Sequence, residues 1–592
     1  MNTHTLSGYD IYDYIISGAR RIIHNEKTLN TINVFPIADS DTGSNLTYTM
    51  KCIIAKSIRS EHIGTTLSSI SKVASEDSFG NSGTIFASYL TGLAQEANDK
   101  SEMTPIEFAA AANTATLYAY DAVARPEEGT MLTVMRVWSD YLITNAGDTT
   151  DLKHLFSSAF KQAQIALENT RNQLRVLKES NVVDAGALGF VYFLEGILEF
   201  IDKKATEFFK EKSYGNVNLE LSHNKPNYRY CCEFLVESAQ TASTKSAKNI
   251  YQLALERFDH DMDSLIVQNT GDFMKIHCHM NTPDTIADFL AQHGKIVKSK
   301  IDDMQVQHSI AHNKKHSIGI VTDTIADIPE SWLQDYQVTR IPLHLLVDGN
   351  AYVDRYTVTS NNLYTLLDHA VKYPTSGQPG DLYVEKTLET LLTHYDHVLG
   401  IFVSSEMSGL FDKVDRAAHK LNQNLGQKKL HIFDSKANSA SQGLIIHDAI
   451  QLIQKNYSIE EIVNKLTLDL NKYHIHVEIP DLHYATQSGR VPKILGGIAG
   501  MFGLKVVISI NEDGKGIVCK ERSLDKIVKQ IRKSRTLENY VIVHSQNPES
   551  AQAYADMLED ITGIAPLFIN EVSSVVAAFV GKGSVGIGYK DV

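Results

Sequence analysis

Cysteine is scarce in this chain of 592 residues, which contains only Cys52, Cys231, Cys232, Cys278 and Cys519. An odd, scattered set of cysteines in a large chain does not make a disulfide framework, so we expect a reducing compartment. The sequence also lacks an uncharged apolar run long enough to span a bilayer, and acidic residues interrupt its start, where a signal peptide needs an apolar stretch. We therefore predict a cytoplasmic protein that is not an integral membrane protein.

The sequence has no excess of basic residues, and its formal net charge is −14. A nucleic-acid-binding protein normally presents a basic face, so the charge argues against nucleic acid as a partner. Hydrophobic residues make up 43% and charged residues 21% of the chain, which is typical of a globular protein. The length exceeds what one hydrophobic core supports and predicts about three or four domains.

The pattern of apolar residues changes along the chain and divides it into three parts joined by a linker. Residues 1–205 are predicted to be mostly helical, and residues 206–227 lose periodicity, as a linker does. Residues 228–312 alternate short strands with helices and predict a small α/β domain. From residue 316 to 592, apolar strands such as SIGIVTD and YVIVHS alternate with amphipathic helices, which implies a parallel sheet with crossover helices.

Two carboxylates, Asp39 and Asp41, lie one residue apart in the stretch NVFPIADSDTGSNL, and Thr42, Gly43 and Asn45 follow them. Carboxylates at this spacing on a loop can converge on one Mg²⁺, which prefers one or two protein carboxylates together with waters and phosphate oxygens. Thr42 and Asn45 add neutral oxygen atoms at the same turn. Taken alone, the segment is compatible with either an acidic helix cap or a metal site.

Three further segments contain the small residues and glycines that bound phosphate requires. Residues 80–83 (GNSG) open a helix with bare amides, residues 125–134 (RPEEGTMLTV) break a helix, and residues 182–189 (VVDAGALG) place Asp184 beside two glycines. Helix N-termini with exposed backbone N–H groups bind anions. Each segment alone is also compatible with an ordinary helix-to-loop turn.

In their order, these motifs resemble the DhaL-type (DAK2-like) nucleotide-binding domain of bacterial fatty acid kinases and dihydroxyacetone kinases. The resemblance implies an all-α helical barrel that binds Mg²⁺ through Asp39 and Asp41 and ATP at one end. Asn33 stands where dihydroxyacetone kinases have a third acid, which favours the fatty acid kinase branch. We predict nucleotide contacts at Asn33, Thr42, Asn45, Ser82, Gly83, Thr130, Met131, Asp184 and Gly186.

The strand FMKIHCHM places His277 and His279 two residues apart, so both side chains point to the same side. Together with Cys231 on an earlier strand, they could bind Zn²⁺ and leave a fourth position open. The alternative is that the histidines face solvent or form hydrogen bonds within the sheet. The segment resembles the middle domain of fatty acid kinases, which implies catalytic roles for His277 and His279 and a homodimer formed through this domain.

From residue 316 onward, the succession of motifs resembles the DegV family of fatty acid-binding proteins. This implies an α/β DegV-like (EDD) domain of two subdomains that encloses an acyl chain. Matched motif by motif, the carboxyl group would be bound by Thr375, Ser376, Ser404, Ser405 and Arg490. Taken singly, each hydroxyl is equally compatible with a helix cap or turn, and Arg490 with a surface salt bridge.

Two positions depart from the DegV pattern. The family often reads TSQPS where this chain reads TSGQPG, and Phe579 stands where the family has a histidine before a glycine-rich turn. Loss of the imidazole removes one hydrogen-bond donor from the head-group site. The ligand would then be bound in a different way, or the domain would have a docking or structural role.

These inferences together predict an ATP-dependent fatty acid kinase fused to its acyl-binding module. It would form acyl phosphate from the bound fatty acid or from one presented by a separate DegV-type carrier protein. One alternative is a lipid-binding regulatory protein with a vestigial nucleotide site. A second is a dihydroxyacetone (glycerone) kinase-like enzyme, but the sequence shows no recognisable triose-binding domain with a reactive histidine.

Overall fold

The structure is a computed structural model, and it describes residues 5–35, 41–123, 125–147, 151–202, 226–238, 245–269, 273–488, 505–534 and 537–592. The chain forms two compact units. The first comprises Met1–Asn281 and Gln292–His312, and the second comprises Thr282–Ala291 and Asn313–Val592. Most of the predicted linker at 206–227 lies outside the described residues, so the domain boundaries inferred from the sequence stay a prediction.

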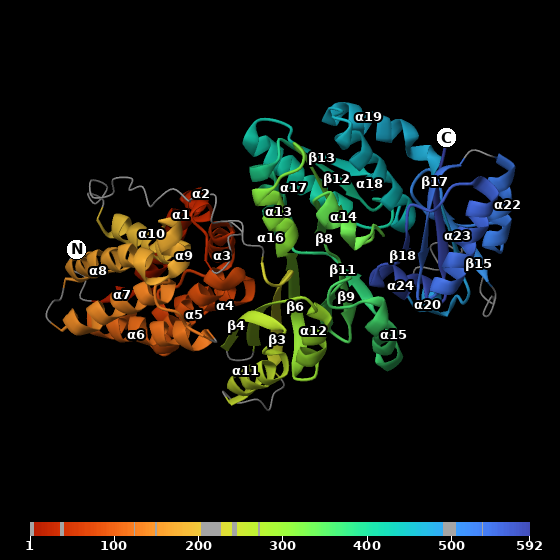
Figure 1. Ribbon diagram of the computed structural model, residues 1–592. Coiled ribbons are helices and arrows are strands. Elements are labelled where there is room, and N and C mark those ends of the chain that lie inside the picture. The colour runs from red at the N-terminus through yellow and green to blue at the C-terminus, as the bar shows by residue number, and fades with distance from the viewer. Residues whose placement is uncertain are drawn as a thin grey trace. The chain divides into compact units, whose positions relative to one another are not determined.

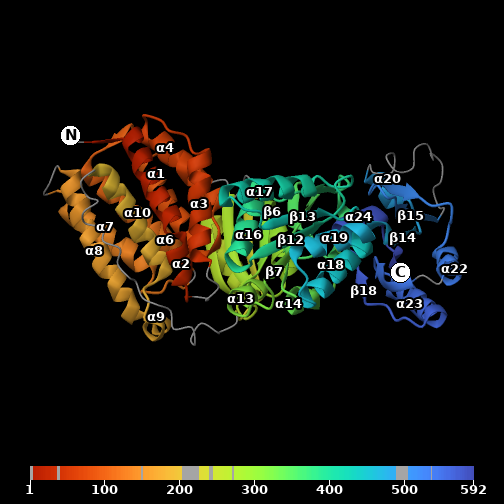
Figure 2. The ribbon, with the colours of Figure 1, turned by 90° about the horizontal axis from the view of Figure 1, so that it is seen from above.

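The first part of unit one is helical, as predicted (Figures 1 and 2). Its helices are α1 (Gly8–His24), α2 (Glu26–Thr31), α3 (Thr42–Lys56), α4 (Ile63–Asp77), α5 (Gly80–Ala97), α6 (Pro105–Ala122), α7 (Met131–Asn145), α8 (Leu152–Gln173), α9 (Arg175–Ser180) and α10 (Ala185–Ile201). Strands β1 (Leu6–Ser7) and β2 (Glu102–Met103) form a short antiparallel pair. The nearly all-apolar α10 contacts α1, α2, α3, α7 and α8, so it forms the centre of one continuous hydrophobic core.

The helix ends follow the local sequence signals. Thr104 and Glu107 form a capping box at the start of α6 with Pro105 in the first turn, as the sequence predicts. The helix ends at Ala122, before Pro126. The amphipathic stretch from Tyr9 to Leu29 is divided between α1 and α2.

The middle part of unit one is a four-stranded antiparallel sheet in the order β4-β5-β3-β6. Its strands are β3 (Tyr230–Ser238), β4 (Met262–Asn269), β5 (Phe273–Met280) and β6 (Gly294–Asp303), with helices α11 (Lys245–Phe258) and α13 (Met304–His312). In this sheet Cys231 lies opposite both His279 and Asp302, and Glu233 lies opposite both His277 and Lys300. Directly opposite residues share one face, so these side chains gather on a single side of the sheet.

Unit two contains three sheets. The parallel sheet β13-β12-β7-β8 is built from β7 (Ile318–Asp323), β8 (Val338–Ile341), β12 (His397–Phe402) and β13 (Leu430–Asp434). A small antiparallel sheet contains β9 (His344–Val347), β10 (Asn350–Val353) and β11 (Thr375–Gly377). The third, in the order β16-β15-β14-β19-β17-β18, contains β14 (Tyr473–Ile479), β15 (Val506–Ile510), β16 (Gly516–Val518), β17 (Leu537–His544), β18 (Ile569–Glu571) and β19 (Val585–Asp591).

The helices of unit two connect and cover these sheets. They are α12 (Pro283–Ala291), α14 (Glu330–Asp335), α15 (Ser360–His369), α16 (Asp381–His394), α17 (Leu410–Leu425), α18 (Ser439–Gln454), α19 (Ile459–Asp469), α20 (His483–Gln487), α22 (Leu524–Ser534), α23 (Pro548–Thr562) and α24 (Ser574–Val580). Helix α18 contacts β12 in the parallel sheet and β14, β17 and β19 in the six-stranded sheet, so it joins the two subdomains.

The expected parallel arrangement holds for only part of unit two. The four-stranded sheet is parallel, the three-stranded sheet is antiparallel, and in the six-stranded sheet β17 and β18 form the one parallel pair among the described strands. The segment YVIVHS forms β17, which pairs antiparallel with β19 in the six-stranded sheet and does not join β7, β12 and β13. Strand β19 follows α23, β18 and α24 in the chain and then runs back along β17, a pairing that a pattern of apolar runs does not reveal. The α/β class of the C-terminal domain is nevertheless confirmed.

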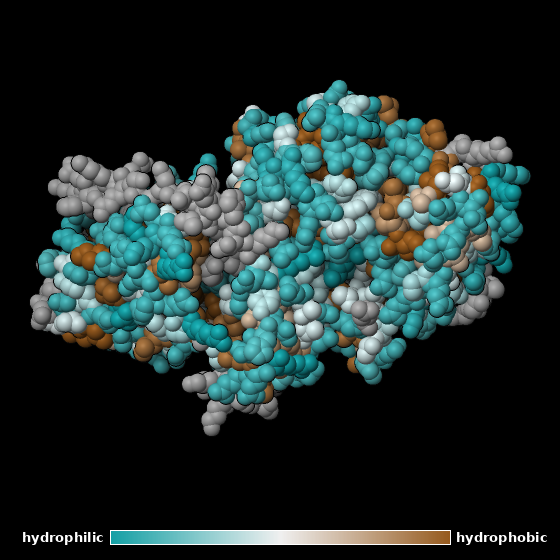
Figure 3. Space-filling view, viewed as in Figure 1, coloured by the Kyte–Doolittle hydropathy of each residue, from teal (hydrophilic) through white to brown (hydrophobic). Residues whose placement is uncertain are grey.

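On the face shown in Figure 3, hydrophilic residues predominate and hydrophobic ones appear in separate patches. Within the described parts of the chain, none of the helices combines the length and the apolar character that crossing a bilayer requires.

Candidate functional site

The first element of the site in unit one is the start of α3. Asp41 precedes the helix, and the side-chain amide of Asn45 donates a 2.7 Å hydrogen bond to its Oδ2. Thr42 donates through Oγ1 to Oδ1 of the buried Asn33 at 2.9 Å. Asp39, the other predicted magnesium ligand, lies outside the described residues. The local bonds therefore orient one carboxylate, Asp41, at a helix N-terminus.

The start of α5 packs directly against the start of α3. Gly80 has a φ of +66°, and a Cβ at this position would lie 2.4 Å from Asn45 Nδ2. A Cβ on Gly83 would lie 3.0 Å from Thr49 Oγ1. Glycine is therefore required at position 80 both for the left-handed backbone and for the close approach. The GNSG segment brings bare backbone next to the Asp41 turn, as the sequence predicts.

The starts of α7 and α10 lie beside Ser82 of α5. Asp184 caps α10 by accepting a 2.7 Å hydrogen bond from the Ala187 amide, and it also accepts from the backbone of Met131. A Cβ on Gly186 would lie 3.1 Å from both Ser82 Oγ and Met131 Cε. Burial raises the pKa of Asp184 to about 6, although these backbone hydrogen bonds oppose the rise. Asp184 thus fixes two helix starts to each other.

Thr130 is the residue before α7, and its hydroxyl donates to the backbone carbonyl of Glu127 at 2.8 Å. The N-termini of α3, α5, α7 and α10 consequently meet at one end of the helical domain. Each N-terminus carries partial positive charge, which favours a polyanion, although Glu233 and Asp184 already accept hydrogen bonds from the amides of Gly80, Met131 and Ala187.

The charged face of the middle sheet docks on this end of the helical domain. Glu233 Oε1 accepts a 2.5 Å hydrogen bond from the Gly80 amide, and Lys275 Nζ donates to the Ser78 carbonyl at 2.8 Å. The Lys300 ammonium lies 3.8 Å from the centroid of the Phe79 ring. Burial opposes the ionisation of Glu233, but the positive charges of Lys300 and Lys275 outweigh it and lower its pKa.

Cys231, His277 and His279 form one cluster, and each offers a ligand atom within 4.8 Å of the others. The Cys231 sulfur lies 3.8 Å from His277 Nδ1, and His279 Nδ1 lies 2.9 Å from Asp263 Oδ1. Nε2 of the buried His277 has no hydrogen-bond partner among the described residues. Burial lowers the pKa of His277 and raises that of the Cys231 thiol. The neutral imidazole of His277 with its unpaired Nε2, the ring of His279 and the thiol of Cys231 make a donor set that fits Zn²⁺.

A small cavity of about 40 Å³ joins these elements, enough for a few water molecules. Its walls come from three separate sequence motifs and from β6 and α13, namely Asp41, Thr42, Asn45, Gly80, Asn81, Ser82, Cys231, His279, Asp302, Met304 and Gln307. The structure therefore brings the acidic turn, the GNSG helix start and the histidine strand together. Among the other predicted nucleotide residues, Asn33 accepts from Thr42 of this wall, Gly83 follows Ser82, and Gly186 lies close to Ser82. Met131 and Asp184 adjoin Gly186, and Thr130 precedes Met131.

Sequence reasoning did not identify Glu233, Lys300 or Asp302. Glu233 interrupts the apolar strand CCEFLVE two residues after Cys231, and this spacing could have placed both on one face. Strand β6, which carries Lys300 and Asp302, was not predicted. Its lysines, Lys295, Lys298 and Lys300, interrupt the apolar pattern. Lys300 is nevertheless largely buried beside Asp302, whereas Lys295 and Lys298 are about half exposed.

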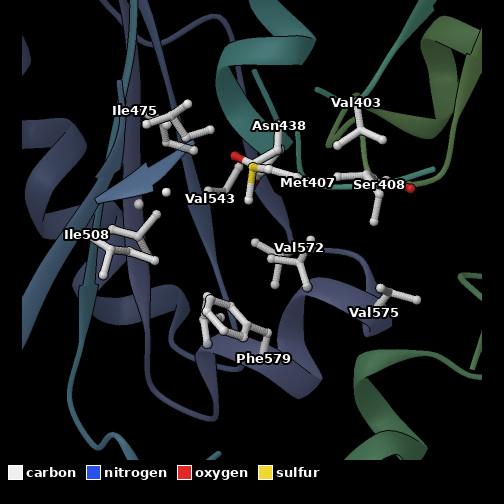
Figure 4. A pocket seen from close by; sticks show the side chains of 18 of the residues that line it. Val403, Met407, Ser408, Asn438, Ile475, Ile508, Val543, Val572, Val575 and Phe579 are labelled. Atoms are coloured by element: carbon white, nitrogen blue, oxygen red, sulfur yellow. The ribbon is translucent and has the colours of Figure 1, made fainter. Parts of the chain in front are cut away.

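Unit two contains a separate and much larger cavity of about 470 Å³. Its walls come from both subdomains and are mainly aliphatic, including Ile325, Val403, Ile475, Val477, Ile508, Val543, Val572, Val575, Val576 and Val585. In Figure 4, Ile475 and Ile508 lie across a common space from Val575 and Phe579. A largely aliphatic cavity of this size suits an extended apolar molecule.

The predicted lipid-binding residues are distributed unevenly around this cavity. Ser376 lines it, and Thr375 is exposed on the same strand. The hydroxyl of Ser404 donates to the Gly514 carbonyl at 2.9 Å, and that of Ser405 donates to Asp434 Oδ2 at 2.7 Å. Neither serine is among the lining residues. Arg490 lies outside the described residues.

Comparison with family models gives a match for each of the three parts. Residues 36–199 match the DAK2 domain, residues 227–311 match the FakA-like middle domain of fatty acid kinase, and residues 317–591 match "Uncharacterised protein, DegV family". These ranges include the acidic turn, the histidine strand and the large cavity respectively.

Among curated proteins, the chain is similar to an uncharacterized protein of Staphylococcus saprophyticus, with 30% identity over 326 residues. That match covers 53% of this chain and 58% of the relative. The chain is also 29% identical over 321 residues to protein YloV of Bacillus subtilis, covering 52% of this chain and 57% of YloV. The matches thus span less than two thirds of each relative's length.

Among solved structures, the chain is similar to a fatty acid binding DegV family protein from Streptococcus agalactiae, with 24% identity and a TM-score of 0.41. It is also similar to DegV, a fatty acid binding protein from Bacillus subtilis, with 20% identity and a TM-score of 0.42. Each match covers 47% of this chain and 100% of the solved chain. On the family matches, the chain combines a DAK2 domain, a FakA-like middle domain and a DegV-family domain in one polypeptide.

Proposed function

We propose that this protein is an ATP-dependent fatty acid kinase that transfers the γ-phosphoryl group of ATP to a fatty acid carboxylate, giving acyl phosphate and ADP. The observation that carries the proposal is the cavity shared by Asp41, the GNSG helix start, Cys231 and His279. The matched DAK2 and FakA-like segments support a phosphotransferase. These matches do not identify the acceptor of the phosphoryl group, and the fatty acid is our proposal.

The N-termini of α3, α5, α7 and α10 would bind the phosphates of ATP. Ser82 and the backbone at Gly83 would contact phosphate oxygens, whereas the Gly80 amide already donates to Glu233. Asp41, oriented by Asn45, would bind Mg²⁺, and the predicted second ligand is Asp39. Bound Mg²⁺ neutralises charge on the phosphates, which phosphoryl transfer requires more than covalent help from the protein.

The second metal candidate fits the residues of the middle sheet. Cys231, His277 and His279 would bind Zn²⁺, and Asp263 would orient His279 through its Nδ1. Zn²⁺ bound by these residues would supply a Lewis acid. Glu233 holds His277 close to the Gly80 amide, so the histidines and the phosphate-binding helix start keep a fixed separation. Metal analysis of purified protein should find zinc in the wild type and in Cys519→Ser but not in Cys231→Ser.

The cavity in unit two would hold the fatty acid. Its aliphatic walls suit an acyl chain, and Ser376 offers a hydroxyl to the carboxyl group. Separate DegV-type carrier proteins are an alternative source of the acceptor. We further propose a cytoplasmic protein, since all five cysteines are free thiols. The resemblance of the middle domain also leads us to propose a homodimer, which light scattering would test.

The test is to incubate purified protein with ATP, Mg²⁺ and oleate and to trap acyl phosphate with hydroxylamine. The proposal expects acyl-hydroxamate that depends on both ATP and oleate. Absence of hydroxamate, even when a purified DegV-type carrier protein loaded with oleate is added, would contradict it.

A second candidate is a lipid-binding regulatory protein that does not turn over ATP. The 470 Å³ cavity favours it, because this cavity is complete within unit two and needs no residue of the nucleotide domain. It predicts that fatty acid copurifies with the protein, detected by mass spectrometry, while ATP is neither bound nor hydrolysed.

A further inference from the structure

Hydrogen bonds fix the position of the hairpin between β15 and β16 next to the large cavity. Within its turn, the Asn511 amide donates to the Lys515 carbonyl at 2.9 Å, and the Lys515 amide donates to Asn511 Oδ1 at 2.8 Å. The Ser404 hydroxyl donates to the Gly514 carbonyl, and a Cβ on Gly514 would lie 2.3 Å from that hydroxyl oxygen. The turn is therefore held in one position against the loop that follows β12.

This arrangement places one cation and one anion at the cavity. Lys515 and Glu406 both line it, and Lys515 Nζ lies 3.6 Å from Glu406 Oε2. Their side chains are 57% and 46% exposed, so they lie where the cavity meets solvent. Among the described residues that line the cavity, Lys515 is the only lysine or arginine.

The carboxylate of a bound fatty acid needs a donor or a cation to offset its desolvation. The hydroxyls of Ser404 and Ser405 already donate within the protein, and Phe579 has no polar side-chain atom to offer. An exposed ion pair such as Lys515–Glu406 contributes little to stability, so Lys515 can exchange Glu406 for another carboxylate.

We propose that Lys515 selects ligands with a carboxylate head group, and that Glu406 competes with the ligand for Lys515. The acyl chain would contact the aliphatic walls, and the head group would lie at the mouth beside the β15–β16 hairpin. This inference rests on the proposed function, because it assigns the residue that recognises the acceptor.

The test compares two ligands of equal chain length, oleate and oleyl alcohol, in binding assays on the full chain. Lys515→Met should weaken oleate binding about tenfold, the scale of a hydrogen bond to a charged group, and leave oleyl alcohol unchanged. Glu406→Gln should strengthen oleate binding about threefold, because it removes the competing anion. Lys520→Met is the matched control, since Lys520 is exposed shortly after β16 and does not line the cavity.

Three outcomes would overturn the assignment. If Lys515→Met leaves oleate binding unchanged, or weakens oleate and oleyl alcohol equally, Lys515 does not recognise the carboxylate. If Glu406→Gln weakens oleate binding, Glu406 is not a competitor. A wild-type protein that binds neither lipid would overturn the acceptor in the proposed function as well, whereas failure of the variants alone would leave that function standing.

Discussion

The two cavities of this chain are built in opposite ways. The cavity in unit one is small and lined mainly by charged and polar groups, several of which have a specific partner, as Asp41 has Asn45 and Asp302 has Lys300. The cavity in unit two is more than ten times larger, and aliphatic side chains from many elements line it. The stability that a buried charge pair provides depends on one contact, whereas the stability that an apolar wall provides is divided among many side chains.

This difference predicts unequal sensitivity to substitution. In unit one, removal of one charge leaves a buried partner without compensation. In unit two, most single substitutions in the wall change packing alone, and only the few polar groups act individually.

The largest effect is expected for Glu233→Gln. Glu233 is the counter-charge of the buried Lys275 and the acceptor for the Gly80 amide. Breaking a buried charge pair typically costs about 3–5 kcal/mol, so the unfolding transition of unit one should move to clearly lower temperature. Differential scanning calorimetry would measure it.

The matched control is Glu237→Gln on the same strand. Glu237 is exposed and lies 3.9 Å from Lys295, so its replacement should change the transition little. Equal destabilisation by the two substitutions would show that the buried charge of Glu233 has no special role in stability.

The next effect concerns Asp323, a buried carboxylate of unit two. It accepts hydrogen bonds from the amides of Val403 at 2.7 Å and Ile325 at 2.9 Å, and both of these residues line the large cavity. Burial raises the pKa of Asp323 from 3.8 to about 6. A raised pKa means that the folded state binds the proton more tightly. The stabilisation is therefore complete below pH 3.8 and is lost as the pH rises through 6.

Asp323→Asn removes this titration. Between pH 4 and pH 7 the wild type should lose up to about 3 kcal/mol of unfolding free energy relative to the variant, which corresponds to the difference between the two pKa values. Urea unfolding of unit two at both pH values measures the change. A difference between the two proteins that does not vary with pH would contradict the assignment.

The smallest effect is expected for Phe579→His in the wall of the large cavity. The substitution adds one hydrogen-bond donor where Figure 4 shows an aromatic ring facing the cavity. One hydrogen bond contributes about 1 kcal/mol, so oleate should bind about fivefold more tightly while oleyl alcohol gains less. Weaker binding of both ligands would instead indicate that the ring acts only by packing.

The sequence predicted those parts of the structure that depend on local patterns. The capped start of α6, the helical character of residues 1–205 and the strand that carries His277 and His279 follow from periodicity and capping residues. The pairing of β17 with β19 and the existence of β6 did not follow, because they depend on contacts between distant segments.

The candidate site shows the same difference between features set by local sequence and features set by contacts between distant segments. Residue types and spacing suggested Asp41, Ser82, Cys231 and His279 separately, and the structure shows that they line one cavity. Their proximity could not be derived from spacing along the chain. Ser404 illustrates the reverse case, because its hydroxyl is predicted to bind lipid and in the structure donates to the Gly514 carbonyl. Only the tertiary structure reveals that this donor is already used.

The central claim is that the acidic turn before α3 binds a cation that positions ATP. The most direct measurement is the thermal shift produced by ATP with and without Mg²⁺ in the wild type, in Asp41→Ala and in Asp140→Ala, a control with an exposed aspartate on α7. We predict that Mg²⁺ and ATP together raise the melting temperature of the wild type and of Asp140→Ala but not of Asp41→Ala. A wild-type protein that shows no shift, or an equal shift in all three proteins, would contradict the account.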